Sequence, residues 1–137
     1  MKAILLTFFV VFSFFNMSGQ SIQDGSYRST GYIKDDGTIQ DGSYRTQGYI
    51  REDGSILDDS YRTIGYIRSD GSIQDGSYRT VGYLRDDGEV QDGSYRTIGY
   101  VKQDGEVQDG SYRTLGYARG VRKDWAAVVF FFFKFED

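Results

Sequence analysis

The ionisable side chains with the clearest pattern are aspartates that each stand four residues before an arginine, in the motif Asp-x-Ser-Tyr-Arg. The aspartates of its six copies are Asp24, Asp41, Asp58, Asp75, Asp92 and Asp109. A symmetric array of carboxylates and guanidinium groups could bind a multivalent ligand. We favour a simpler interpretation, in which each pair spans a tight turn, because exposed ion pairs contribute only about 0–1 kcal/mol.

Tyrosine is the second candidate for function, since the sequence has 12 tyrosines and each repeat carries two of them. Exposed aromatic rings at regular spacing would form a surface on which sugar rings stack. The candidate ligand-binding residues are the tyrosines of the Gly-Tyr dipeptides, Tyr32, Tyr49, Tyr66, Tyr83, Tyr100 and Tyr117. The competing interpretation is that tyrosine and glycine pack neighbouring hairpins together, which a small domain without disulfides needs.

Catalytic, metal-binding and cofactor-binding residues are not expected. The sequence has no histidine and no cysteine, and it shows no nucleophile beside a base and no glycine loop that enters a helix. Its aspartates match neither the calcium-binding nonapeptide repeat nor the helix-loop-helix calcium site. The net charge of −4 argues against nucleic acid as a partner. Carbohydrate or another cell-envelope protein remain as partners.

A period of 17 residues must position these side chains, because the motif returns at that spacing from Asp24 to Asp109. Strand-forming stretches rich in Tyr, Thr, Ile and Val alternate with two turn signals in each unit, and proline is absent. Residues 20–117 are therefore predicted to be an all-β hairpin repeat domain. Six copies of the longer strand enclose five complete hairpins, at residues 32–46, 49–63, 66–80, 83–97 and 100–114.

The turn residues predict the strand register. A three-residue loop at 52–54 would pair Ile50 with Ile56 on one face, with Gly54 in a left-handed conformation. The second signal, Asp-Gly, suits a two-residue turn whose glycine has positive φ. Asp59 replaces that glycine in one unit, so Asp59→Gly is expected to raise the melting temperature.

The repeats are expected to close into a ring rather than an open stack. An open stack needs atypical polar units at both ends, whereas the first half-unit, residues 21–32, matches the others. The ring would be pseudo-fivefold, like a flower or a propeller.

Both ends of the chain differ from the repeats. Residues 1–19 combine Lys2, an apolar run and a small polar exit, which predicts a cleaved signal peptide and a secreted, periplasmic or cell-envelope protein. A retained membrane anchor is the alternative; after cleavage no stable membrane span is expected. Residues 118–137 are interpreted as a closing segment of the same domain. Its run from Trp125 to Phe133 is apolar on all sides and should be buried, as a strand by preference or as a short helix.

The pattern Gly-Tyr-Ile-Arg-x-Asp-Gly-x-Ile-x-Asp-Gly-Ser-Tyr-Arg-Thr, repeated five times before a Phe-rich terminus, resembles the five-fold β-flower proteins exported by Bacteroidetes. The resemblance covers nearly all of the chain after residue 19. It implies five hairpin petals around a pseudo-fivefold axis, and it brings no established activity or functional residues. We expect a non-enzymatic structural or interaction module; the alternative is a glycan-binding, lectin-like module that uses the tyrosines named above.

Overall fold

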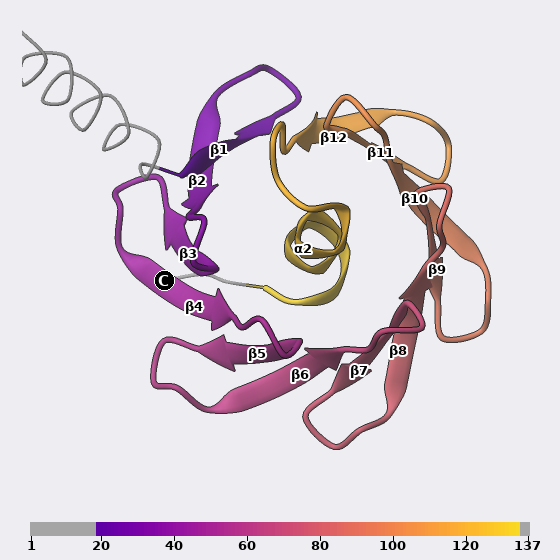
Figure 1. The fold of residues 1–137 in the computed structure, drawn as a ribbon. Helices are drawn as coiled ribbons and strands as arrows, with labels where there is room; N and C mark the ends of the chain where they lie inside the picture. The colour runs from indigo at the N-terminus through magenta and orange to yellow at the C-terminus, as the bar shows by residue number, and fades with distance from the viewer. Residues whose placement is uncertain (1–18, 135–137) are drawn as a thin grey trace, which may run out of the picture.

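The protein is a closed antiparallel barrel of 12 strands with a short helix inside it (Figure 1). The computed structural model describes residues 19–134, so the signal peptide predicted for residues 1–19 lies, except for Gly19, outside the described residues. The strands are β1 (Gln20–Asp24), β2 (Ser29–Ile33), β3 (Thr38–Asp41), β4 (Thr46–Ile50), β5 (Ser55–Asp58), β6 (Thr63–Ile67), β7 (Ser72–Asp75), β8 (Thr80–Leu84), β9 (Glu89–Asp92), β10 (Thr97–Val101), β11 (Glu106–Asp109) and β12 (Thr114–Tyr117). Each strand pairs with its neighbours in the sequence, and β1 pairs with β12.

Two kinds of turn alternate around the barrel. We call the turns that join β1 to β2, β3 to β4 and so on to β12 the tyrosine turns, and those that join β2 to β3 and so on to β11 the glycine turns. The strand order gives six hairpins with tyrosine turns, and five glycine turns connect them. The sixth junction has no connecting turn and is formed by pairing of β1 with β12. The expected pseudo-fivefold ring is therefore not confirmed, because non-covalent closure adds a sixth equivalent position to the five covalent ones.

The glycine turns have the predicted three-residue geometry. Ile50 lies opposite Ile56 across the turn at 52–54, and Gly54 has a φ of 93°. The N–H of Arg51 donates to the carbonyl of Ser55, at 2.9 Å, and closes the loop. The predicted register is thus confirmed for this hairpin, and it places both isoleucines inside the barrel, where they are fully buried.

The tyrosine turns differ from the prediction of a two-residue Asp-Gly turn. In the turn between β3 and β4, the N–H of Asp41 donates to the carbonyl of Arg45 at 2.9 Å, which leaves a three-residue loop between them. The left-handed residue of that loop is Tyr44, with a φ of 69°, and not Gly42. Asp59 likewise does not belong to the positive-φ residues of the described chain. The expectation that Asp59 strains its turn was therefore wrong.

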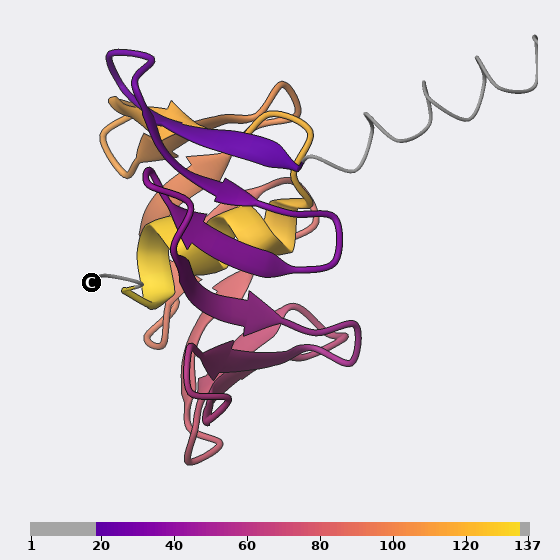
Figure 2. The same cartoon turned by 90° about the vertical axis from the view of Figure 1, so that its left-hand side faces the viewer.

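The barrel interior holds the C-terminal apolar segment, which is helical rather than the preferred strand. Helix α2 (Lys123–Ala127) continues into a π-helical turn, η1 (Val128–Phe132), and Figures 1 and 2 show this segment inside the ring of strands. In a closed barrel every strand edge is already paired, so an extended central segment would bury unpaired N–H and C=O groups. A helix instead pairs its own groups, as in the 3.0 Å bond from the Ala126 N–H to the Arg122 carbonyl.

Successive phenylalanine rings of this helical segment rest on successive units of the barrel wall. A methyl group built on the glycine of a Gly-Tyr dipeptide would lie 2.3–3.1 Å from a phenylalanine ring atom. The contacts are Phe130 on Gly116, Phe131 on Gly99, Phe132 on Gly82 and Phe133 on Gly65. Because no other residue lets a ring approach the strand this closely, these glycines allow the C-terminal helical segment, which we call the plug, to fit inside the barrel.

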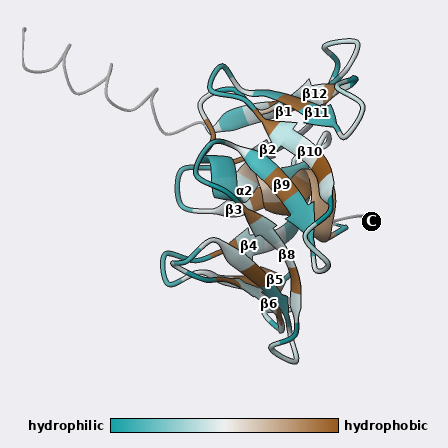
Figure 3. Cartoon of the chain, turned by 90° about the vertical axis from the view of Figure 1, so that its right-hand side faces the viewer, coloured by the Kyte–Doolittle hydropathy of each residue, from teal (hydrophilic) through white to brown (hydrophobic). Residues whose placement is uncertain are grey.

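Hydropathy follows this arrangement. Figure 3 shows apolar stretches on the strands and the inner helix and polar residues at the turns. The buried core consists of Ile and Val residues from most of the strands together with Ala118 and, from the C-terminal segment, Trp125, Ala126, Ala127 and Val128. Within residues 19–134, no helix has the length and apolar character needed to cross a membrane.

Candidate functional site

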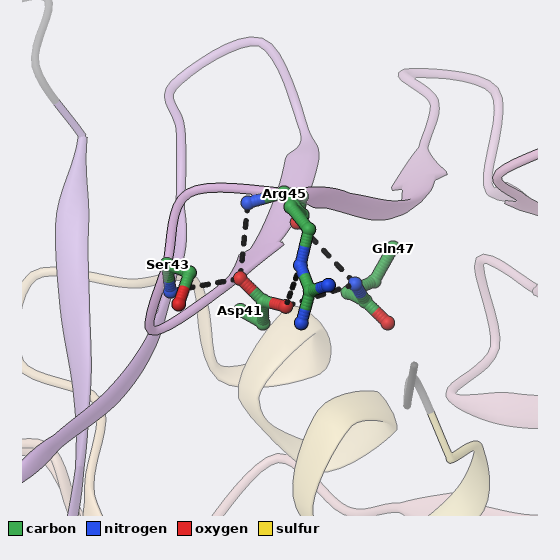
Figure 4. Close-up of polar contacts among 4 residues, drawn as sticks. All are labelled: Asp41, Ser43, Arg45 and Gln47. Carbon is green, nitrogen blue, oxygen red and sulfur yellow. Dashed lines mark hydrogen bonds and ion pairs between the residues drawn. The ribbon is translucent and has the colours of Figure 1, made fainter.

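Each tyrosine turn is built around one aspartate side chain. In Figure 4, Asp41 Oδ1 accepts the backbone N–H groups of Ser43, at 2.8 Å, and of Arg45, at 3.0 Å, while Oδ2 accepts Arg45 Nε at 3.0 Å. The amide of Gln47 adds a longer contact, 3.4 Å, to the same carboxylate. The carboxylate therefore accepts hydrogen bonds from turn N–H groups that cannot pair with a neighbouring strand. Asp24, Asp58, Asp75, Asp92 and Asp109 make the same three bonds.

This geometry explains the Asp–Arg spacing without a ligand. The backbone N–H of Arg62 and that of Ser60, together with the guanidinium of Arg62, hold the pKa of Asp58 below its ordinary value. The arginine side chains of the pairs stay largely exposed, at about four-fifths for Arg62. The array of aspartates and arginines is accounted for by the turns themselves.

The left-handed tyrosine is the unusual feature of these turns. Tyr44 occupies the position that Gly54 takes in a glycine turn, since both turns share the same two backbone hydrogen bonds. A non-glycine residue with positive φ costs about 1 kcal/mol or more. All six tyrosine turns accept this cost, with φ between 67° and 70°. The side chain at this position must therefore return a benefit, through packing or through function.

Every left-handed tyrosine stacks on a tyrosine of a neighbouring hairpin, and for Tyr27 of the first hairpin this neighbour is the last one. Ring centroids are 4.6–4.9 Å apart and the planes lie within 10–12° of parallel. The tyrosine pairs are Tyr27–Tyr117, Tyr32–Tyr44, Tyr49–Tyr61, Tyr66–Tyr78, Tyr83–Tyr95 and Tyr100–Tyr112. Stacking contributes about 0.5–1.5 kcal/mol per pair beyond the buried area, so it offsets the backbone strain approximately.

The two tyrosines of each pair lie in different environments, one half-buried and one exposed. The six sequence-predicted residues, Tyr32, Tyr49, Tyr66, Tyr83, Tyr100 and Tyr117, are half-buried between hairpins. Their partners are 57–65% exposed and form the outer face of each pair. Those partners, which the sequence reasoning missed, are Tyr27, Tyr44, Tyr61, Tyr78, Tyr95 and Tyr112. The equal spacing of Asp41 to Tyr44 and of Arg51 to Gly54 was the signal that could have identified the second turn type.

Hydroxyl groups also connect the rings of a pair. The Tyr100 hydroxyl donates to the Tyr112 hydroxyl at 3.1 Å, and equivalent bonds of 3.0–3.1 Å join four other pairs. Because this bond exists only while the donor is protonated, it raises the pKa of Tyr100 to about 12. The bond to the outer tyrosine likewise raises the pKa of the inner tyrosine in four other pairs, at Tyr49, Tyr66, Tyr83 and Tyr117.

The pairs differ in what lies beside them. The guanidinium of Arg119 lies 4.5 Å from the ring centroid of Tyr117. Beside Tyr100 and Tyr112 a groove of about 430 Å³ opens instead, bounded by residues of two glycine turns. We call this the Tyr100 groove. A separate hollow of about 540 Å³ lies between the phenylalanines of η1 and strands β2 and β3; Lys134, the last described residue, forms part of its wall.

Within residues 19–134, no group of three or more His, Cys, Asp or Glu side chains could hold a metal ion. The side chains that stand out are the aromatic pairs, which can stack on a ligand, and the carboxylates and amides of the neighbouring turns, which can accept or donate hydrogen bonds.

Comparison with known proteins identifies a family and no individual relative. A family model described as 5-fold beta-flower protein matches residues 19–134. The chain matches no curated protein and no solved structure.

Proposed function

The chain belongs to the 5-fold beta-flower protein family, and we propose that it is an exported, non-enzymatic interaction module that binds its partner through several tyrosine pairs at once. One observation carries this proposal: the outer tyrosine of every pair is more than half exposed although its backbone is strained. Glycine at that position would remove the strain, as it does in the glycine turns. Retaining tyrosine six times favours a role for the exposed ring.

Multiplicity supports the same proposal. A single exposed tyrosine pair offers a small contact area, and contacts of that size bind weakly. Several equivalent contacts on one rigid barrel raise the affinity for a repetitive partner, because each later contact forms within the same complex. A partner with repeated units, such as a polysaccharide or an ordered cell-envelope protein, fits this arrangement best.

Export rests on the sequence of residues 1–19, whose charged start and apolar run are typical of a signal peptide. A barrel without cysteine needs no oxidising compartment, and the plug and hydrogen-bonded turns can stabilise it without disulfides. We place the protein in the periplasm, at the cell envelope or outside the cell.

Glycan binding is the second candidate for function. The observation that favours it is the pairing of flat exposed rings with nearby carboxylates and amides in the Tyr100 groove. Aromatic rings stack on the C–H faces of sugars, and planar polar groups bind their hydroxyls.

Binding of the purified protein to immobilised bacterial cell-envelope material tests the proposal. We expect a variant with Tyr44, Tyr78 and Tyr112 all replaced by glycine to bind in far less than half the amount of the natural protein. The reason is that avidity falls steeply as the number of contacts decreases. Periodate treatment of the material would identify a glycan partner and protease treatment a protein partner. Equal binding by the variant, or no binding by the natural protein, would refute the proposal.

A further inference from the structure

The Tyr100 groove is lined by aromatic, carboxylate and amide side chains of the outer surface. It lies where the Tyr100–Tyr112 pair meets two consecutive glycine turns, which contribute Asp87 and the residues 102–104. Gln108 of β11, opposite Tyr100 in the strand register, also lines it. Its volume of about 430 Å³ falls in the range of small-ligand sites, roughly 300–1,000 Å³.

We propose that the Tyr100 groove is a subsite for one unit of an uncharged polysaccharide, with Tyr112 as the stacking platform and Asp87, Gln103 and Asp104 as hydrogen-bond partners of the sugar hydroxyls. This inference rests on the proposed interaction function and names both the ligand class and the part of the ring that binds it. The described contacts support it in three ways.

The first is the accessible ring. Tyr112 is 65% exposed, the highest value among the outer tyrosines, and its inner face is held against Tyr100 at 4.9 Å. A ring fixed in this way loses little freedom when a ligand stacks on it. In the Tyr27–Tyr117 pair, by contrast, Arg119 already lies against the ring of Tyr117. Position 102, which corresponds to Arg119, is a lysine and has no planar group that could stack in the same way.

The second is the supply of hydrogen bonds. Since Tyr100 donates to Tyr112, the hydroxyl of Tyr112 retains its own hydrogen for a ligand oxygen. The carboxylates of Asp87 and Asp104 accept hydrogen bonds, and the amide of Gln103 both accepts and donates. Sugar hydroxyls are donors and acceptors at once, so this mixture of groups can satisfy several of them.

The third is charge. The groove contains two carboxylates, Asp87 and Asp104, against one ammonium group, Lys102. An acidic sugar would bring a further negative charge to a site that is already net negative, which is unfavourable. The expected ligand is therefore a neutral polysaccharide and not a uronic acid polymer.

Titration of the purified protein with soluble oligosaccharides tests this subsite. The probes are hexasaccharides of glucose with β-1,4 or α-1,4 linkages, and a hexasaccharide of galacturonic acid serves as the charged comparison. Binding is followed by calorimetry and by NMR signals of the groove residues. At least one neutral probe should bind and shift the signals of residues 102–104, whereas the acidic probe should not.

Two variants with equivalent substitutions separate the loss of the subsite from a general loss of stability. Tyr112→Ala and Tyr44→Ala each remove an outer tyrosine of similar exposure from a stacked pair, so their melting temperatures should fall equally. Tyr112→Ala should weaken binding of the neutral probe at least tenfold, about 1.4 kcal/mol, and Tyr44→Ala, which lies outside the groove, should weaken it much less. Gln103→Ala, at an exposed turn, should weaken binding without changing the melting temperature.

The outcomes distinguish this inference from the function on which it rests. Equal losses in Tyr112→Ala and Tyr44→Ala would overturn the Tyr100 subsite and leave a multivalent module with equivalent pairs. Failure of every neutral probe, combined with envelope binding that survives periodate, would overturn the sugar ligand and leave a protein partner. If the natural protein bound neither the neutral oligosaccharides nor the cell-envelope material, both the Tyr100 subsite and the interaction function would be overturned.

Discussion

Tyr27 and Tyr117 are 90 residues apart in the sequence, yet their rings stack at 4.7 Å and their hydroxyls lie 3.0 Å apart. The other pairs have the same geometry although only 12 residues separate their members. The junction between the first and last strands is therefore made like the covalent junctions. Its strand pairing, with Gln23 opposite Tyr117, completes the barrel without any connecting turn.

The balance between strain and stacking at the outer tyrosines can be measured at Tyr61. Tyr61→Ala removes the stack on Tyr49 and keeps a side chain in a left-handed conformation, whereas Tyr61→Gly removes the stack and the strain together. The glycine variant should be more stable than the alanine variant by about 1 kcal/mol. Thermal denaturation of both proteins checks this order. If alanine proved the better replacement, positive φ at residue 61 would not be a source of strain.

Asp59→Gly should lower the melting temperature slightly. Because residue 59 does not have positive φ, glycine brings no relief there and increases the entropy of the unfolded chain, at a cost of about 0.5–1 kcal/mol. Gly54→Ala provides the contrast, since a methyl group at Gly54 would lie 2.2 Å from the Ile67 carbonyl oxygen in a backbone with positive φ. That variant should be far less stable. Calorimetry of both would show whether the two turns differ as described, and a stabilised Asp59→Gly protein would contradict the turn geometry.

Gln74→Leu should stabilise the protein by about 1 kcal/mol. The side-chain oxygen of Gln74 is buried and has no hydrogen-bond partner among the described residues, which is unfavourable. The corresponding residue two strands earlier, Leu57, is buried and shows that leucine fits this position. Urea denaturation measures the difference. The reverse change, Leu57→Gln, should destabilise the barrel, and a gain in stability there would argue against this explanation.

Acid should destabilise the barrel through its turn aspartates. Backbone N–H groups, first that of Arg113, lower the pKa of Asp109, and Asp24, Asp58, Asp75 and Asp92 are lowered by the equivalent bonds. A carboxyl whose pKa is lower in the folded state stabilises that state above its unfolded pKa, near 3.9, and loses this contribution as the pH falls through the folded pKa.

The melting temperature should therefore be constant near neutral pH and fall below about pH 4. Asp109→Asn should lower stability at pH 7 and reduce its loss between pH 4 and pH 2. Thermal melts across that range give the measurement. A melting temperature that stayed level down to pH 2 would show that these carboxylates do not stabilise the folded state.

Local spacing predicted the parts of the fold that depend on local chemistry. The alternation around Gly54 indicated both the three-residue turn and the pairing of Ile50 with Ile56, because only that register keeps the aliphatic side chains on one face. All-β structure and closure of the barrel followed from the repeats and are confirmed. The tyrosine turn was missed because glycine is the usual left-handed residue, and Tyr44 takes that place only since its ring stacks on Tyr32.

Properties that depend on the whole ring were less accessible from the sequence. The conformation of residues 125–133 follows from the absence of any free strand edge, which only the closed barrel reveals. The division of each tyrosine pair into an exposed and a half-buried ring also depends on contacts between neighbouring hairpins. The candidate list drawn from the Gly-Tyr dipeptides therefore contained the inner member of each pair and omitted the outer one.

The contacts of the C-terminal segment bear on the number of repeats that the barrel can hold. Phe130 to Phe133 contact the units in reverse chain order, from Gly116 back to Gly65. Adding or deleting one unit of two strands would change the circumference of the barrel, which grows with strand number, while the helix keeps its width. The number of repeats is therefore matched to the diameter of the single helix that the barrel encloses.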